Sequence, residues 1–409
     1  MGLPIYPFHL SLADGEQSAR QISEFYRRSL IEDIAPFWIR HGIDRKYGGY
    51  LTSLDRDGSL LQGDKSVWFL GRMAWMFSRM TQRYGELVSP EVRQEWMTAA
   101  ESGVRFMEYY AFDADGRMFF SLTREGRPLR KRRYLFSECF AIIALAAYAE
   151  VSCSPERLKR AEELLELVET YRRTPGLLEP KVNPSSRPSI GLSLPMILLV
   201  TAQELRRSGG NPDLCQSVID RALSEIRLFL QPNLRCLLEM ATPDGQLIDT
   251  IEGRCVNPGH SLEVGWFILE EARWRNNDPE LRALGLQIIE WSFEKGWDEE
   301  YGGILYFRDA HNRPCTEYWH DMKFWWPHNE AILAALYAWK ITGDDRFAVW
   351  HDRVAHWAYR HFPDLEHGEW YGYLHRDGSV STPVKGSPYK GFFHLPRMLM
   401  VAEELIRHG

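Results

Sequence analysis

A phrase that recurs about every 65 residues constrains the fold of this chain more than any other feature. Each copy alternates apolar or aromatic residues with small or polar ones and then breaks at a turn pair such as Asp-Gly, which is typical of a short β-hairpin. The copies begin at Gly48, Gly116, Arg235, Gly302 and Gly368, and a degenerate copy begins at Gly176. Six units account for the whole chain, so we expect one domain spanning residues 1–409.

Helical patterns occur in pairs between these phrases. The helix after a phrase, as in FSECFAIIALAAYAE, is apolar on most faces, whereas the helix before one, as in SPERLKRAEELLELVETYRR, is amphipathic. A helix that is apolar all round is buried, and an amphipathic helix keeps one face in water. The pattern therefore predicts an all-α fold, an (α/α)6 barrel of six inner and six outer helices with the hairpins at one rim. An open solenoid would give the same pattern.

The twelve helices are expected at residues 16–41, 65–84, 89–110, 135–150, 155–172, 190–207, 212–231, 260–275, 279–296, 324–342, 345–362 and 394–408.

Composition excludes several classes of function. The net charge is -7 with acids and bases interspersed, so the chain lacks the basic stripe expected of a nucleic-acid or membrane-surface protein. The six cysteines show no CxxC spacing or regular pairing, which indicates reduced thiols and a cytoplasmic location. No stretch reads as a signal peptide or a membrane-spanning helix.

Polar or aromatic residues recur near the start of the helices expected in the core. Each lies 22 to 26 residues after the start of its phrase: Arg72, Glu138, His260, Trp326 and His394. Equivalent positions in a ring of units converge on the axis at one pole. Because buried polar groups must be paired or functional, this convergence predicts a site there.

His260 and Glu263 also have a purely structural interpretation. Asn257 can cap the helix, Pro258 suits its first turn, and an acidic residue is favoured there. The shared offset favours function instead. We expect Glu263, one turn after His260, to orient its imidazole.

Several sequence blocks carry a family resemblance. They are KSVWFLGRMAWMFSRM, RYLFSECF, NPGHSLEVGWF, MKFWWPHNEA and VKGSPYKGFFHLPRM. In content and order they resemble the N-acylglucosamine 2-epimerase family, which includes the renin-binding protein. The resemblance implies an (α/α)6 barrel, catalytic histidines at His260 and His394, and supporting residues at Arg72, Glu263 and Glu330. One departure is Leu194, where many relatives have a histidine.

The expected chemistry is inversion at C2 of a sugar. It needs two opposed groups that can act as acid or base near neutral pH, and histidine suits both roles. Arg72 can stabilise the enediolate without a metal, and Trp326 and Tyr389 offer flat surfaces for a sugar. We therefore expect an isomerase, a sugar 2-epimerase interconverting N-acetylglucosamine and N-acetylmannosamine, that requires no cofactor. The resemblance also implies that the protein forms a homodimer and that ATP acts as an effector.

Other interpretations stay open. The same histidines could serve an aldose–ketose isomerase or a 2-epimerase of unmodified sugars such as mannose or cellobiose. A glycoside hydrolase could use Glu239, Glu263 and Glu330 but would leave both histidines without a role. A non-catalytic protein-binding role would not explain why polar residues converge at one pole of the barrel. Glu138 and Lys323 could form an ion pair or touch the substrate, and His328 is expected to be structural.

Overall fold

The computed structural model describes residues 3–132 and 134–408. Its first helix runs without a break through α1 (Glu16–Arg28), a π-helical turn (Ser29–Ile34) and α2 (Ala35–His41). The other helices are α3 (Val67–Tyr84), α4 (Pro90–Tyr110), α5 (Phe136–Ser152), α6 (Pro155–Arg173), α7 (Ser193–Arg207), α8 (Pro212–Ile226), α9 (Pro258–Trp274), α10 (Pro279–Gly296), α11 (Trp325–Thr342), α12 (Asp345–His361) and α13 (His394–His408).

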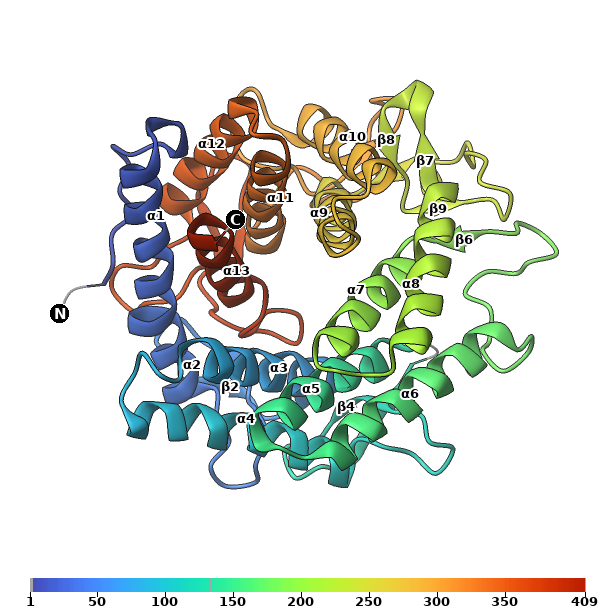
Figure 1. The fold of residues 1–409 in the computed structure, drawn as a ribbon. Helices are drawn as coiled ribbons and strands as arrows, with labels where there is room; N and C mark the ends of the chain where they lie inside the picture. The colour runs from blue at the N-terminus through green and yellow to red at the C-terminus, as the bar shows by residue number, and fades with distance from the viewer. Residues whose placement is uncertain (1–2, 133, 409) are drawn as a thin grey trace.

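These helices form two concentric rings (Figure 1). The inner ring consists of α3, α5, α7, α9, α11 and α13, and each inner helix contacts the next. The ring closes because α13 contacts α3, while α1 packs against α13 from outside. The predicted (α/α)6 barrel of twelve main helices is confirmed among the described residues, and the open solenoid is excluded.

The distribution of apolar residues around each helix agrees with the ring in which the helix lies. In the inner helix α5 every residue from Ser137 to Ala149 is buried, whereas the outer helix α6 buries only one stripe. Small residues bring partners close together. A Cβ atom on Gly265 of α9 would lie 2.5 Å from Ile289 of α10, so this pair of helices packs at a distance that only glycine allows.

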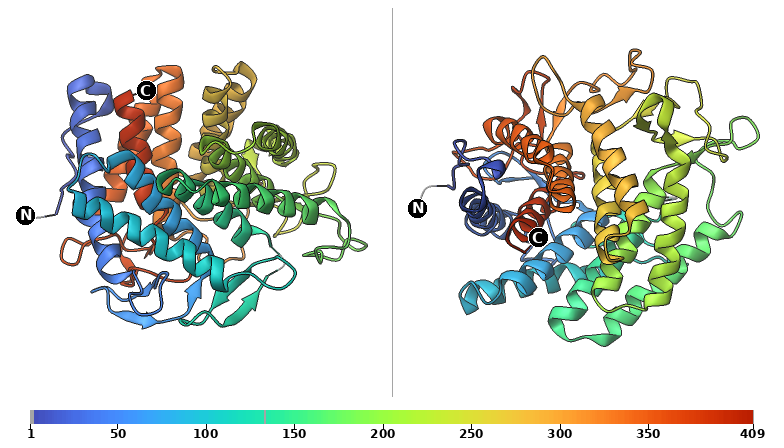
Figure 2. Two further views of the ribbon diagram at one scale, coloured as in Figure 1. Left: turned by 60° about the horizontal axis from the view of Figure 1, so that its bottom comes forward. Right: turned by 45° about the horizontal axis from the view of Figure 1, so that its top comes forward.

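The strands are short and lie beside the N-terminal ends of the inner helices, as Figure 2 (left) shows for the first two units. They are β1 (Ser53–Leu54), β2 (Leu60–Gln62), β3 (Lys65–Ser66), β4 (Phe119–Leu122), β5 (Pro128–Lys131), β6 (Ile190–Gly191), β7 (Leu230–Gln231), β8 (Cys236–Leu237), β9 (Met240–Ala241), β10 (Cys255–Val256), β11 (Arg308–Asp309), β12 (Lys323–Phe324), β13 (Tyr373–Leu374) and β14 (Val380–Thr382).

The phrases at Gly48, Gly116 and Gly368 form the expected hairpins, β1–β2, β4–β5 and β13–β14. The prediction is wrong for the other two phrases. After Arg235, β8 pairs with the preceding β7 and β9 pairs with β6 of the unit before, and after Gly302, β11 pairs with β10. In these two units the short strands therefore connect one unit to the next.

Glu138 and Lys323 do not pair with each other. Glu138 accepts hydrogen bonds from the side chain of Arg117, at 2.7 Å, and from the backbone of Met118. Lys323 donates to Asp298 at 2.9 Å. Both side chains are fully buried and engaged in separate structural ion pairs, so the mutual ion pair that the sequence left open does not form.

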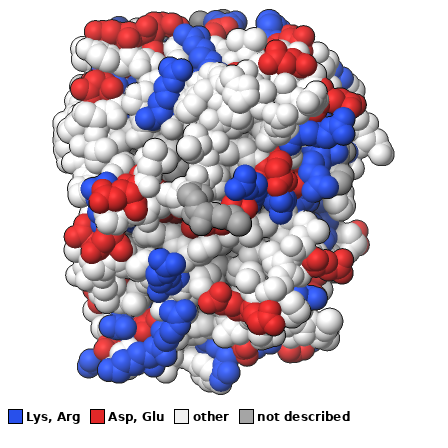
Figure 3. All heavy atoms as spheres, turned by 90° about the vertical axis from the view of Figure 1, so that its left-hand side faces the viewer, with Lys and Arg blue, Asp and Glu red and all other residues white. Residues whose placement is uncertain are grey.

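On the face drawn in Figure 3, acidic and basic side chains are intermingled and form no continuous stripe. Within residues 3–132 and 134–408, no helix is both long and apolar enough to cross a membrane.

Candidate active site

The inner helices enclose a cavity of about 720 Å³, and loops at the hairpin rim contribute to its lining. Six of the residues predicted from sequence line it: Arg72, His260, Glu263, Trp326, Tyr389 and His394. The seventh, Glu330, is fully buried behind His394. Four of the five residues that share the offset from their phrases, Arg72, His260, Trp326 and His394, therefore meet at one pole of the barrel, whereas Glu138 does not line the cavity.

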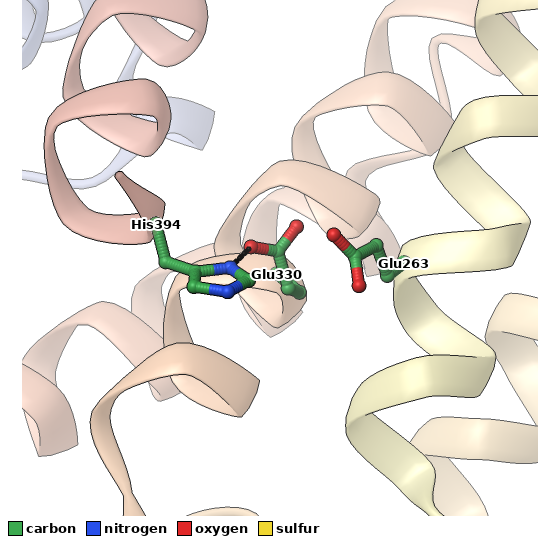
Figure 4. A group of neighbouring side chains, drawn as sticks. All are labelled: Glu263, Glu330 and His394. Carbon is green, nitrogen blue, oxygen red and sulfur yellow. Dashed lines mark hydrogen bonds and ion pairs between the residues drawn. The ribbon is translucent and has the colours of Figure 1, made fainter. Parts of the chain in front are cut away.

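His394 is the first residue of α13 and is held by Glu330 of α11 (Figure 4). Its Nδ1 lies 2.8 Å from Glu330 Oε1, and because a carboxylate only accepts, Nδ1 carries the proton. The other Glu330 oxygen accepts a hydrogen bond from Trp266 Nε1 at 2.9 Å. Burial, together with the positive charge of Arg397, holds the pKa of His394 well below its usual range. His394 thus presents an uncharged Nε2 that can take a proton.

Arg397 is a site residue that the sequence reasoning missed. One turn after His394, its Nη2 donates to Glu330 at 2.7 Å and to Glu263 at 2.5 Å. The guanidinium packs against Phe393, 4.7 Å from the ring centroid. Glu263 therefore belongs to the His394 side of the site. The signal that could have found Arg397 is its position in FHLPRM, three residues after His394 on the same helical face.

His260 is oriented by Glu239, in place of the expected Glu263. Its Nδ1 lies 3.0 and 3.1 Å from the two Glu239 oxygens, and its backbone N–H donates to the capping Asn257 side chain at 3.0 Å. The capped-helix interpretation is therefore also correct. Burial opposes protonation of His260, but Glu239 outweighs it and raises the pKa. Glu239 follows β8 in a loop, where no helical offset could reveal it.

The two histidines thus differ in charge environment. Glu263 and Glu330 are balanced by Arg397 and Arg72, so the group around His394 is neutral when the imidazole is uncharged. Glu239 has no ion-pair partner other than His260 in the described part of the chain, so its charge is balanced only when His260 is protonated. Charges that are partly removed from water favour the neutral combination. The surroundings of His394 thus favour the uncharged imidazole, and those of His260 favour the protonated one.

Trp326 and Arg72 complete the inner walls. The indole of Trp326 lies 4.9 Å from the ring of His260 and 5.7 Å from that of His394, so both imidazoles face the same part of the cavity. The Arg72 guanidinium lies 4.2 Å from the ring of Phe140, its Nε has no hydrogen-bond partner, and burial lowers its pKa to about 9. A buried cation with free donors can receive a developing negative charge.

Tyr389 lies at the mouth of the cavity. It is 51% exposed, and its hydroxyl accepts a hydrogen bond from Arg132 at 3.4 Å. Glu317 and Trp319 line the same mouth from the loop before β12. Tyr389 is thus placed to contact the outer part of a ligand.

His328 lies outside this cavity. Its Nδ1 donates to the Phe324 carbonyl at 2.7 Å and its Nε2 accepts from the Ile304 N–H at 2.9 Å. Burial lowers its pKa to about 3, and the ring stacks on Trp357. A histidine with both nitrogens bonded to backbone has a structural role, as expected from the sequence.

Leu194 marks the third unit's departure from the family pattern. It packs at the edge of the core, while Ser193, Met196 and Ile197 of the same helix face the cavity. The first turns of α7 thus present Met196 and Ile197 to the cavity, beside the hydroxyl of Ser193.

Glu263, Glu330 and His394 offer ligand atoms within 4.8 Å of one another. Such a group could hold a metal ion, but the Arg397 guanidinium already bridges the two carboxylates. A divalent cation would have to displace this fixed positive charge, so the group fits an ion-pair network better than a metal centre.

Comparison with known proteins identifies the family and agrees with the fold. The model of the family "N-acylglucosamine 2-epimerase" matches residues 49–396. The N-acylglucosamine 2-epimerase of Bos taurus is 35% identical over 384 residues, covering 92% of this chain and 90% of the relative. The cellobiose 2-epimerase of Bacillus thermoamylovorans B4167 has a similar structure, with a TM-score of 0.80, 21% identity, and 95% and 99% of the two chains covered. A D-mannose isomerase structure gives a TM-score of 0.77 at 18% identity, covering 93% and 97%. The chain belongs to the N-acylglucosamine 2-epimerase family.

Proposed function

We propose that this protein is a sugar 2-epimerase that interconverts N-acetylglucosamine and N-acetylmannosamine with His260 and His394 as its two catalytic residues. The observation that carries the proposal is the unequal pair of histidines. Each is held by a carboxylate at Nδ1 and both face the indole of Trp326, but only the carboxylate behind His394 is neutralised by an arginine.

The reaction follows from this arrangement. His394 Nε2 removes the proton from C2 of the open-chain sugar, and the C–H electron pair moves toward C1, placing negative charge on the C1 oxygen. Arg72 and the N-terminal ends of the inner helices stabilise that charge. His260 then returns a proton to C2 from the other side, and the carbonyl re-forms. The acetamido nitrogen on C2 cannot become a ketone oxygen by this route, so the product is the epimer.

Incubation with N-acetylmannosamine, mannose and cellobiose in deuterated water tests the proposal. With N-acetylmannosamine we expect deuterium to enter at C2 and N-acetylglucosamine to form. NMR of the reaction mixture measures both changes. Epimerisation of cellobiose or mannose alone, or formation of fructose from mannose, would assign the same histidines to an unmodified sugar. No exchange with any of the three sugars would contradict an epimerase.

Three further properties belong to this proposal. A cytoplasmic location is supported by the six cysteines, all of which are free thiols. A homodimer and an ATP effector are proposed from the family resemblance. Sedimentation of the purified protein tests the first of these two, and calorimetric titration with ATP tests the second. We also propose that residues 1–409 act as one domain without a required cofactor.

A further inference from the structure

Tyr306 is a cavity residue to which the proposed reaction gives no role. It lies in the segment between α10 and β11 and lines the cavity. Three aromatic neighbours hold its ring, whose centroid lies 4.0 Å from that of Phe324, 4.5 Å from that of Phe307 and 5.9 Å from that of Trp326. The phenol therefore has a fixed place in the cavity wall.

The hydroxyl of Tyr306 is available to a ligand. Its proton has no acceptor in the described part of the chain, and the indole N–H of Trp326 approaches the phenol oxygen as a donor. Burial and the negative charge of Glu239 raise the pKa of Tyr306 above its usual range, so the hydroxyl stays protonated at neutral pH. The hydroxyl of Tyr373, in contrast, already lies 3.3 Å from Ser387 Oγ.

Tyr306 and Arg72 lie at different depths in the cavity. The inner helices begin at the hairpin rim, and Arg72 lies in the second turn of α3. Tyr306 packs on Phe324, which precedes the first residue of α11. The backbone N–H of the adjacent Phe307 donates to the His320 carbonyl, at 2.9 Å, in the loop before β12. Arg72 is thus near the deeper end of a sugar held between the histidines, and Tyr306 is near the end at the rim.

The chemistry of the sugar determines which end meets each residue. Negative charge develops on the C1 oxygen, and Arg72 is a buried cation without an ion-pair partner among the described residues. The carbons far from C1 carry hydroxyl groups, which need hydrogen-bond partners when they leave water. We propose that Tyr306 is a further substrate-binding residue, whose hydroxyl donates a hydrogen bond to a hydroxyl group at the C4–C6 end of the sugar. The proposal rests on the function proposed above and identifies a residue that recognises the far end of the substrate.

Binding of an open-chain analogue tests the contact without turnover. N-acetylmannosaminitol has the hydroxyl groups of the open-chain substrate but no carbonyl, so it cannot epimerise. Calorimetric titration should give a Kd about tenfold higher for Tyr306→Phe than for the unchanged enzyme, because one sugar hydroxyl loses its partner. Tyr359→Phe is the matched control, since the buried Tyr359 hydroxyl on α12 also lacks a partner but lies outside the cavity. Equal Kd values for Tyr306→Phe and the unchanged enzyme would overturn the proposal.

Deoxy substrates identify the hydroxyl group that is contacted. With N-acetylmannosamine, Tyr306→Phe should lower kcat/KM about tenfold. With the 4-, 5- or 6-deoxy compound that lacks the contacted group, the same substitution should lower kcat/KM less than about twofold. Equal losses with every deoxy compound would show that the phenol only packs, and a loss that disappears only with the 3-deoxy compound would place the wrong end of the sugar at Tyr306. Either result would overturn the proposal. If the unchanged enzyme did not epimerise N-acetylmannosamine, the proposed function would fail, and the Kd comparison would still decide the role of Tyr306.

Discussion

At the scale of single residues, the most informative contact is the one between Arg397 and Glu330. Both histidines have a carboxylate at Nδ1, but the pKa of one is lowered and that of the other is raised. The groups that face His394 are Glu330, Arg397, Glu263, Arg72 and His260. Arg397 is the positioning residue in this group. Its positive charge offsets the negative charges of Glu330 and Glu263, which would otherwise favour the protonated form of His394.

Replacement of Arg397 by methionine should therefore raise the pKa of His394, since Glu330 and Glu263 lose their shared cation. We expect the low-pH limb of the kcat/KM profile to move upward by about one pH unit or more, the shift that one close charge typically produces. Titration of the ¹³C-labelled His394 ring by NMR measures the same shift without turnover. Arg397→Lys keeps the charge and should largely restore the profile.

Arg206→Met is the control for this experiment. It breaks a buried pair, Arg206 with Glu271 at 2.7 Å, that lies outside the cavity. If this variant moved the His394 titration as far as Arg397→Met does, the effect would be general loosening of the barrel rather than the charge of Arg397.

The division of labour between the histidines can be read from proton exchange. His394→Asn and His260→Asn should each abolish net epimerisation, since loss of a positioned acid or base costs about 10²–10⁴-fold. Each variant should still exchange the C2 proton of one epimer in deuterated water, and the two variants should differ in which epimer exchanges. If one variant lost exchange from both epimers while the other stayed nearly active, a single-base mechanism would replace the two-base one.

The pH dependence of activity follows from the same two histidines. In the direction in which His394 removes the C2 proton, activity requires His394 uncharged and His260 protonated. It should rise as pH increases through the lowered pKa of His394 and fall as pH increases through the raised pKa of His260. The apparent values belong to the coupled pair. Glu239→Gln removes the charge that raises the His260 pKa, so it should move only the alkaline limb, toward lower pH. Movement of the acid limb instead would reverse the assignment of acid and base.

At the scale of secondary-structure elements, the sequence predicted helices far better than strand pairing. Helix periodicity is local and extends over many turns, so every expected helix is present. Two-residue strands have no such signal, and β9 and β11 find partners in neighbouring units. The same difference applies to the site. His260 and His394 share a helical offset, whereas Glu239 is brought to His260 only by tertiary packing.

A buried ion-pair motif recurs where the units meet. An aspartate after an outer helix pairs with a buried lysine farther along the chain and with an arginine from a hairpin of the adjoining unit. The three examples are Asp44 with Lys65 and Arg124, Asp298 with Lys323 and Arg376, and Asp364 with Lys385 and Arg56. These contacts hold the rim on which the cavity mouth is built.

Lys323→Met should destabilise the protein by about 3–5 kcal/mol, because it leaves the buried Asp298 carboxylate short of its partner. Lys323→Met combined with Asp298→Asn removes both charges and should recover part of that loss. Chemical denaturation of the three proteins measures the difference. If the double variant were less stable than the single one by the full cost of a second broken contact, the two residues would not act as a pair.

At the scale of the whole molecule, the last unit must meet the first without a peptide connection. Besides the contact of α13 with α3, three sets of contacts join the two units. The first helix packs on α13, the backbone of Lys385 and Gly386 pairs with Leu54, and Arg56 reaches Asp364 at 2.8 Å. Because α13 carries both His394 and Arg397, closure of the ring also places the proposed catalytic base.

Two matched arginines show whether the ring unfolds as one body. Arg56 and Arg376 have side chains 38% and 39% exposed, and each donates to a buried aspartate at 2.8 Å, but only Arg56 joins the chain's two ends. In a closed ring every unit has two neighbours. Loss of either contact should therefore lower the free energy of unfolding by the same amount, about 1–2 kcal/mol, and leave one unfolding transition. Calorimetry of Arg56→Met and Arg376→Met measures this, and hydrogen exchange in α1 and α13 reports the junction directly. An early separate transition in the Arg56 variant alone would show that the barrel opens at this junction before the rest unfolds, and would contradict a single cooperative ring.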